Sequence, residues 1–171
     1  GVGVGEVVSL QLPNWWQFNA MHLACARIGA ITNPLMPIFR QRELRYMLGF
    51  AESKVVIAPH VFRGFEYKPM IEEIRGDLPD LAHAFYIDGE GADDFATVLL
   101  SEPLEEGASA DATLAARRPA PNDVNEVIYT SGTTGQPKGV MHTANSTLGH
   151  LSAWIEHLGL NSGDKIFMAS P

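Results

Sequence analysis

Cysteine is nearly missing from the sequence, which contains Cys25 alone, and this excludes a framework of disulfide bonds. The neighbours of Cys25 are alanine and leucine residues, so we predict a small buried side chain there and not a catalytic thiol. Long apolar runs are missing too: none approaches the roughly 20 residues needed to cross a bilayer. The N-terminus also lacks the basic-then-apolar pattern of a secretory signal. We therefore expect a cytoplasmic protein with no membrane span.

Basic residues are scarce as well. The 12 lysines and arginines stand against 20 aspartates and glutamates, which gives a formal net charge of -8 at pH 7. Because a surface of this charge repels polyanions, we do not expect nucleic acid as a partner. An anionic small molecule would have to be held by a local site that gathers donors and positive charge.

The chain is long enough for one globular domain, since 46% of its 171 residues are hydrophobic and 19% are charged. It begins Gly1-Val2-Gly3 without a methionine and stops at Pro171. Residues 165–169, just before that end, have the apolar character of a short strand. From these two ends we expect a piece of a longer protein.

Short apolar runs alternate with helical patterns through the first 87 residues, and β-branched and aromatic residues are frequent in the runs. Strands are predicted at 7–12, 30–33, 54–58 and 84–87, and helices at 15–28, 42–50 and 66–75. This alternation predicts an α/β fold, with a parallel sheet flanked by helices on both faces.

An acidic segment interrupts the alternation after residue 87. Between residues 88 and 111 the chain carries eight carboxylates and no lysine or arginine. These are Asp88, Glu90, Asp93, Asp94, Glu102, Glu105, Glu106 and Asp111. A metal site is the alternative here, but the spacing does not match a calcium loop. We predict a solvated connector with a short helix near 95–100.

The stretch YTSGTTGQPKG, residues 129–139, combines three glycines, three threonines, a serine and a lysine. It follows a predicted strand at 126–130 and precedes a predicted helix at 144–158, so we expect the loop to join a strand to a helix. Glycines let the backbone N–H groups approach an anion, while hydroxyls and Lys138 add donors and charge. We predict a phosphate-binding loop, with a mobile Gly/Thr connector as the alternative.

Two familiar glycine motifs do not fit. The usual P-loop would need a glycine where Pro137 stands and a serine or threonine where Gly139 stands, which argues against kinase and GTPase functions. The glycines at positions 1, 3 and 5 precede a strand instead of following one, so the dinucleotide fingerprint fails as well.

The order YTSGTTGQPKGV at 129–140 resembles the phosphate-loop signature of the adenylate-forming enzymes. This family includes acyl- and aryl-CoA synthetases, luciferases and peptide-synthetase adenylation domains. The stretch LACARIGAITNPLMP at 23–37 is similar to a second segment of the same family, from its amino-terminal domain. The resemblance extends over nearly the whole chain and is closest to acyl-CoA synthetases, among them those acting on cyclic acids such as cyclohexanecarboxylate.

The resemblance implies that residues 1–171 are a single fragment of the amino-terminal AMP-binding domain. In this division 1–87 form the alternating β/α half, 88–121 the acidic connector, and 122–171 the strand, phosphate loop and helix. The cofactor-binding residues implied are Thr130, Ser131, Gly132, Thr133, Thr134, Gly135, Gln136, Pro137, Lys138 and Gly139. Lys138 is also implied as the catalytic residue, because its charge offsets that of the leaving pyrophosphate.

The activity implied is that of an ATP-dependent acid–thiol ligase of fatty or cyclic acid metabolism. It would use ATP, Mg²⁺ and coenzyme A, and a small-molecule carboxylic acid as substrate. The family's magnesium-holding acid, ribose-binding aspartate and carboxy-terminal lysine are not found here, so the remainder of the same enzyme is an expected partner. The fragment alone is expected to be inactive. The alternatives are a peptide-synthetase-type adenylation domain and a non-catalytic nucleotide-binding module.

The histidines offer no zinc-like spacing, and we predict no metal site. His22 lies among apolar residues and is expected to be a structural histidine with a satisfied hydrogen bond. His142 follows the loop directly, and two roles remain open for it: flanking a nucleotide or capping the next turn.

Overall fold

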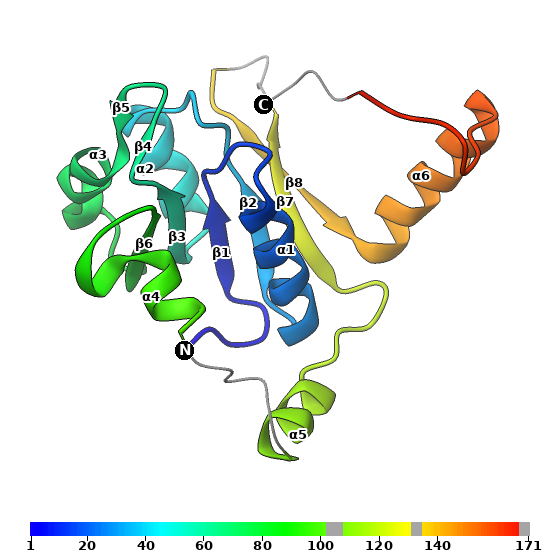
Figure 1. Ribbon diagram of the computed structural model, residues 1–171, viewed down its shortest axis with the longest axis horizontal. Coiled ribbons are helices and arrows are strands. Elements are labelled where there is room, and N and C mark those ends of the chain that lie inside the picture. Colours follow the sequence, from blue (N-terminus) through cyan, green and yellow to red (C-terminus); the bar gives the residue numbers. More distant parts are fainter. Residues whose placement is uncertain (102–107, 131–134, 168–171) are drawn as a thin grey trace.

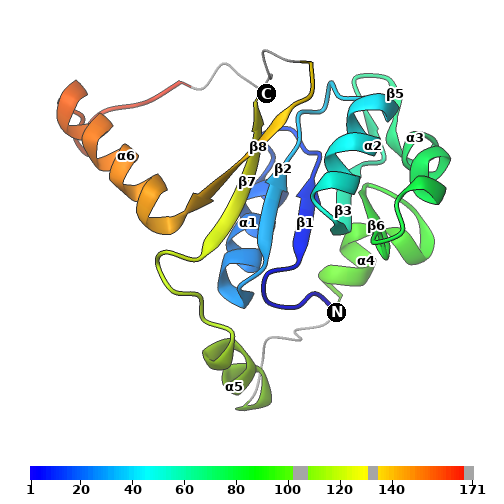
Figure 2. The same ribbon diagram turned by 180° about the vertical axis from the view of Figure 1, so that it is seen from behind.

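The computed structural model describes residues 1–101, 108–130 and 135–167. Its centre is a sheet with the strand order β6-β3-β1-β2-β7-β8 (Figures 1 and 2). The strands are β1 (Val7–Leu10), β2 (Ile31–Pro34), β3 (Ser53–Pro59), β6 (His83–Ile87), β7 (Val124–Thr130) and β8 (Lys138–Thr143). All neighbouring pairs are parallel except β7 and β8, which are antiparallel. The predicted fold class is confirmed, with a sheet that is mostly parallel.

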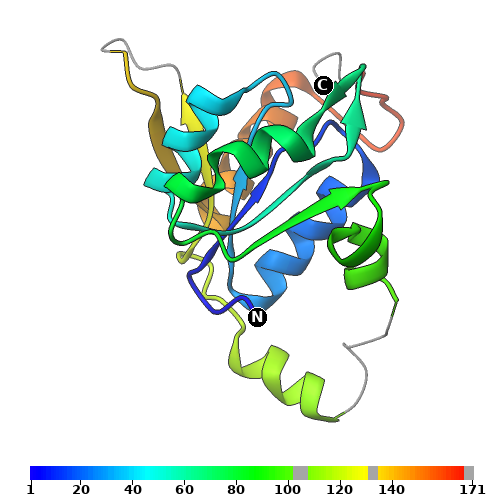
Figure 3. The same ribbon diagram turned by 90° about the vertical axis from the view of Figure 1, so that its left-hand side faces the viewer.

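Helices cover both faces of the sheet, as Figure 3 shows. Helices α1 (Trp16–Ile28) and α4 (Phe95–Leu99) lie on one face, and α2 (Gln41–Phe50) and α3 (Tyr67–Ile74) lie on the other. A small antiparallel hairpin of β4 (Val61–Phe62) and β5 (Phe65–Glu66) precedes α3. Short 3-10 turns follow at Arg75–Asp77 and Gly91–Asp93.

Each covered face has its own hydrophobic core, because successive strand residues point to opposite sides. Under α2 and α3, the core includes Leu44, Val56 and Ile71, all fully buried. Under α1 and α4, it includes Leu10 and Ile57. Burying one such side chain stabilises the fold by about 1.5 to 3 kcal/mol, so the two cores hold this part of the sheet firmly.

The predicted elements up to residue 101 all form, and their ends lie within two residues of the expected ones. The strand before the phosphate loop and the helix at 144–158 also form, as β7 and α6 (Ala144–Leu158). The long apolar periodicity of α6 explains why that helix was predictable.

Three expectations were wrong. Residues 138–143 form strand β8, so the loop joins two antiparallel strands instead of a strand and a helix. The acidic connector contains a second helix, α5 (Ala108–Ala116), whose alanines favour a helix without any apolar periodicity. Residues 165–167 form no strand, and 168–169 lie outside the described residues.

Candidate functional site

The carboxyl ends of the parallel strands meet at one edge of the sheet, which is the edge where open α/β sheets bind ligands. β7 ends there at Thr130, and β8 starts there at Lys138 (Figure 1, top). Helix α5 lies beyond the opposite edge. The two strand ends that flank the predicted phosphate loop therefore lie at the carboxyl edge.

Thr130 and Lys138 face each other across the hairpin, since they are paired in the antiparallel register of β7 and β8. Both residues are exposed, and no ion pair holds Lys138 among the described residues. An unpaired ammonium group thus stands at the mouth of the hairpin, in a chain whose net charge is -8. The expected residues Ser131, Gly132, Thr133 and Thr134 lie outside the described residues.

The glycines of the loop have different structural roles. Gly135 has a φ of 96°, a backbone conformation that side chains with a Cβ rarely adopt. Gly139 instead allows close packing, because a Cβ there would lie 3.1 Å from a methyl carbon of Val127. Between them, Gln136 is exposed and Pro137 is half-buried.

Strand β8 separates the predicted loop from the N-terminus of α6. Helix α6 begins only at Ala144, and its first turn is already satisfied by a capping box between Thr143 and Ser146. The N-terminus of α6 therefore lies at the far end of β8 from Lys138 and does not point at the predicted loop.

Two tyrosines that the sequence did not single out hold the base of the loop. The Tyr46 hydroxyl donates to the Pro137 carbonyl at 3.0 Å, and the Tyr129 hydroxyl donates to the Met47 carbonyl at 3.0 Å. Their ring centroids lie 6.3 Å apart. Burial raises the pKa of Tyr129 to about 12, and the neighbouring Tyr46 adds to this shift. The Tyr129 hydroxyl thus stays a protonated donor at neutral pH.

A cavity of about 410 Å³ also opens at the carboxyl edge, between the segments that follow β2 and β3. Its lining combines apolar and aromatic side chains with two arginines: Met36, Pro37, Ile38, Arg40, Phe62, Arg63, Phe65 and Tyr67. The Arg40 guanidinium lies 3.9 Å from the Phe65 ring centroid and donates to the carbonyls of Pro37 and Phe39. Arg40 therefore serves mainly to build the wall.

Gln11, the residue after β1, holds the segment after β2 that lines this cavity. It is fully buried, and its side-chain amide donates to the carbonyls of Met36 and Phe39 at 3.3 and 3.0 Å. The Tyr67 hydroxyl donates to the Pro37 carbonyl at 2.9 Å. The segment after β2 is thus held by side chains from two other parts of the chain.

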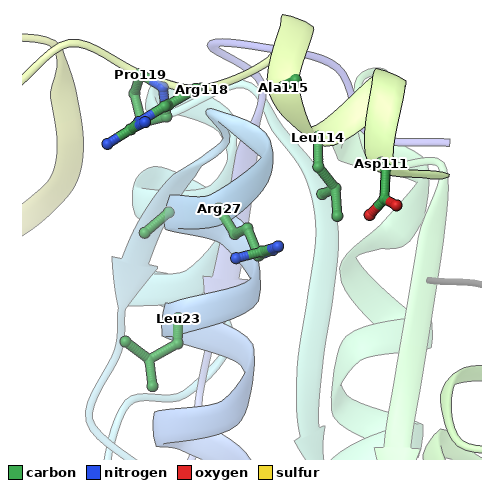
Figure 4. Close-up of a pocket in the computed structure, with 8 residues that line it drawn as sticks. Leu23, Arg27, Asp111, Leu114, Ala115, Arg118 and Pro119 are labelled. Carbon is green, nitrogen blue, oxygen red and sulfur yellow. The ribbon is translucent and has the colours of Figure 1, made fainter. Parts of the chain in front are cut away.

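A larger hollow of about 800 Å³ lies between α1 and α5, away from the hairpin mouth. Figure 4 shows its two arginines pointing in different directions: Arg27 extends toward the side of Leu114 and Asp111, whereas Arg118 points away from them. The hollow brings together none of the residues predicted for the site.

The other candidate residues are structural or lie apart. His22 bonds the Thr32 hydroxyl at 2.9 Å, as expected for a satisfied histidine. Cys25 is buried as predicted, and its burial raises the pKa of the thiol to about 12. His142 pairs with Glu126 within the hairpin, and Thr143 is the cap of α6, so the capping alternative for His142 was wrong.

Within the described residues, no group of three or more histidine, cysteine, aspartate or glutamate side chains is arranged to hold a metal ion. The acidic residues near α4 have local roles: Asp94 caps that helix through Thr97, and Asp93 pairs with Lys68 at 2.6 Å. A search of the same residues finds no helix long and apolar enough to cross a membrane.

Comparison with known proteins adds a family to this geometry. A family model described as AMP-binding enzyme matches residues 1–171. The medium-chain fatty-acid–CoA ligase of Escherichia coli (strain K12) is 31% identical over 171 residues, which are 100% of this chain and 30% of that enzyme. A salicylyl-CoA synthase / salicylate adenylyltransferase of a Streptomyces species is 30% identical over 172 residues, covering 100% of this chain and 31% of its own length.

A solved structure shows the same arrangement of elements. It is a crystal structure of an anthranilate CoA ligase in complex with anthranoyl-AMP. Its TM-score is 0.66 at 26% sequence identity, over 90% of this chain and 28% of that one. The chain thus spans about 30% of the length of the curated relatives given above.

Proposed function

Because this chain belongs to the AMP-binding enzyme family, we propose that it is part of an ATP-dependent carboxylic acid–CoA ligase. The observation that carries the proposal is the unpaired Lys138 opposite Thr130 at the carboxyl edge of the sheet. Relatives named as CoA ligases for medium-chain fatty acids and for salicylate support the reaction class.

In the proposed reaction, a carboxylate oxygen attacks the α-phosphorus of ATP. The bond to pyrophosphate breaks, and an acyl-adenylate forms. The thiol of coenzyme A then attacks the acyl carbon and displaces AMP, which leaves an acyl-CoA thioester. The first step brings two anions together, so it needs positive charge and N–H donors around the phosphates.

Lys138 is the residue to which we assign that charge, and the loop from Thr130 to Gly139 supplies the N–H and hydroxyl donors. Gly135 supports this role because its positive φ turns the backbone sharply within the loop. Mg²⁺ would accompany the ATP phosphates. The described residues offer no cluster of carboxylates for it, and we assign no residue of this chain to that ion.

The remainder of the same enzyme, including a carboxy-terminal domain, is the proposed partner of α6. Five apolar side chains of this helix are at least half exposed: Leu148, Leu151, Trp154, Ile155 and Leu158. The two curated relatives are about three times as long as this chain. We propose that the additional polypeptide of the longer enzyme covers the exposed apolar face of α6. The substitution Leu151→Ala should then destabilise the longer enzyme and leave the stability of the 171-residue chain almost unchanged.

The division into 1–87, 88–121 and 122–171, a cytoplasmic location, and a role in fatty or cyclic acid metabolism belong to the same proposal. Helix α5 at 108–116 modifies the middle part, which is a connector with a helix of its own. Localisation of the tagged enzyme by microscopy would test the compartment.

ATP–pyrophosphate exchange by the full-length polypeptide tests the function directly. The panel should contain linear, cyclic and aromatic acids, such as octanoate, cyclohexanecarboxylate and benzoate. Exchange with one class, followed by thioester formation with coenzyme A, would support the ligase. Exchange without transfer to coenzyme A would favour a peptide-synthetase-type adenylation domain. ATP binding without exchange would favour the non-catalytic module.

Lys138→Ala gives the residue-level test. We expect the exchange rate to fall about 100-fold, the size of effect seen when a group stabilising transition-state charge is removed. Lys165→Ala is the matched control, because this exposed lysine lies beyond α6 and should not affect exchange. An unchanged rate in Lys138→Ala, or loss of its circular dichroism spectrum, would contradict the assignment.

A further inference from the structure

Two tyrosines link the phosphate-loop hairpin to helix α2 in a reciprocal way. Tyr46 of α2 donates its hydroxyl to the carbonyl of Pro137 in the hairpin, and Tyr129 of the hairpin donates to the carbonyl of Met47 in α2. Both distances are 3.0 Å, and the partners are 91 and 82 residues apart in sequence. Each segment thus provides one donor and one acceptor to the other.

The hydrogen-bonded ladder between the hairpin and the body of the sheet is short. In the described chain, β7 pairs with β2 only where Glu126 stands opposite Thr32. From there to Thr130, the ladder partner of β7 is β8, which belongs to the same hairpin. Among the hydrogen bonds of the described residues, the two tyrosine bonds are therefore those that attach the hairpin to the body of the sheet nearest to Lys138.

The two acceptors are well suited to this link. Proline has no N–H group, so its carbonyl is the one backbone hydrogen-bonding group of Pro137. Pro137 directly precedes Lys138, and holding its carbonyl fixes the start of β8. The Met47 carbonyl lies in the last turn of α2, where carbonyls are incompletely satisfied, and it also accepts from the Ala51 N–H at 3.2 Å.

The rings strengthen the link through packing. Tyr46 and Tyr129 are arranged edge to face at 64°, and Tyr46 stacks on Phe50 with ring centroids 5.6 Å apart. Tyr129 also packs against the core under α2 and α3. The hydroxyls are therefore held in place, and their hydrogen bonds cost little conformational entropy.

From this geometry we infer that Tyr46 and Tyr129 are positioning residues for the adenylation step, an inference that rests on the proposed function. They hold Pro137 and the start of β8 so that Lys138 meets the ATP phosphates in one arrangement. They act through the loop and touch no reacting atom. Losing a hydroxyl should thus weaken the use of ATP and leave the use of the acid unaffected.

Tyr46→Phe in the full-length polypeptide tests the inference, because it removes one hydroxyl and keeps the ring. In ATP–pyrophosphate exchange we expect the KM for ATP to rise about fivefold. A change of this size corresponds to the loss of one typical hydrogen bond. The KM for the carboxylic acid should stay as in the wild type, and the urea midpoint should fall only slightly, as expected for the loss of one hydrogen bond. Tyr129→Phe should give the same pattern, and the double variant should show a larger rise than either.

Tyr86→Phe is the matched control. This fully buried tyrosine lies in β6, and its hydroxyl contacts Glu72 at 3.4 Å, far along the sheet from the hairpin. Its KM for ATP should not change. An unchanged KM for ATP in Tyr46→Phe, or equal rises for ATP and acid, would overturn the inference.

A failure of the proposed function would look different. If the wild type catalyses no exchange with any acid, the ligase assignment is wrong, and ATP binding by calorimetry then decides about the tyrosines. Weaker ATP binding by Tyr46→Phe would still support a positioning role. Equal dissociation constants for the two proteins, or no ATP binding by the wild type, would overturn it.

Discussion

The parallel body of the sheet and the β7–β8 hairpin with α6 are built in different ways. In the body, helices cover both faces and enclose two cores of fully buried side chains. In β7, β8 and α6, no described residue is fully buried, although α6 is rich in apolar residues. The body therefore stabilises itself, whereas the hairpin, which carries the proposed phosphate loop, has no buried core of its own among the described residues.

The two regions therefore have different roles at the carboxyl edge of the sheet. The body provides a rigid edge, fixed further by the buried Gln11 amide and the Tyr67 hydroxyl. The hairpin places Lys138 at that edge through Tyr46 and Tyr129. Rigid packing and exposed chemistry thus come from different stretches of the chain, as is common where binding loops sit on a stable sheet.

The largest effect should come from a leucine truncated in the body. Leu44→Ala removes a fully buried side chain from the core under α2 and α3. We expect the free energy of unfolding of the 171-residue chain to fall by about 3 kcal/mol, from lost burial and the cavity left behind. Urea titration followed by circular dichroism would measure it.

Leu151→Ala is the matched change in α6, where the side chain is 51% exposed. In the 171-residue chain its effect should stay within about 0.5 kcal/mol. The same change in the full-length enzyme should cost clearly more if further polypeptide covers α6. Equal costs for Leu44→Ala and Leu151→Ala in the short chain would break the contrast between the two regions.

A smaller effect is expected at the N-cap of α6. The Thr143 hydroxyl accepts from the Ser146 N–H at 3.1 Å, and Thr143→Ala removes that bond. We expect a loss of about 1 kcal/mol in the local stability of the helix. Hydrogen exchange should quicken in α6 alone, since the helix lies outside both cores. Faster exchange in β1 and β3 as well would show that α6 unfolds together with the body.

The sequence predicted the body well because its strands and helices have local signals. Residues 55–58 form an uninterrupted apolar run, as a strand buried on both faces requires. β8 lacked such a signal, since only Val140 and Met141 are strongly apolar there and a capped helix follows at once. Residues 138–143 form a strand because they pair with β7, and this pairing is not visible in the local sequence pattern.

The site divides in the same way. Lys138 and Thr130 could be chosen from the sequence, because glycines, hydroxyls and a lysine gather in one loop. The tyrosines could not, because the bond from Tyr46 to Pro137 joins positions 91 residues apart and no periodicity marks it. Side chains that act on a loop from another element become visible only when the fold brings the two together.

The smallest effect concerns the ionisation of Tyr129 in the hairpin. Burial, with a further contribution from Tyr46, raises its pKa to about 12, against an ordinary value of about 10. Between these values the unfolded chain releases the phenolic proton and the folded chain keeps it. The stabilisation is therefore complete below about pH 10 and is lost as the pH rises toward 12.

Absorbance at 295 nm would follow this proton. The titration of the wild type minus that of Tyr129→Phe should show one tyrosine ionising near pH 12, and the wild type should lose slightly more stability than the variant above pH 10. The loss should be small because Tyr129 is only half-buried. A difference titration centred near pH 10 would mean that water reaches this hydroxyl freely. The hairpin would then lack its attachment to α2, and the contrast with the closely packed body would extend to the base of the loop itself.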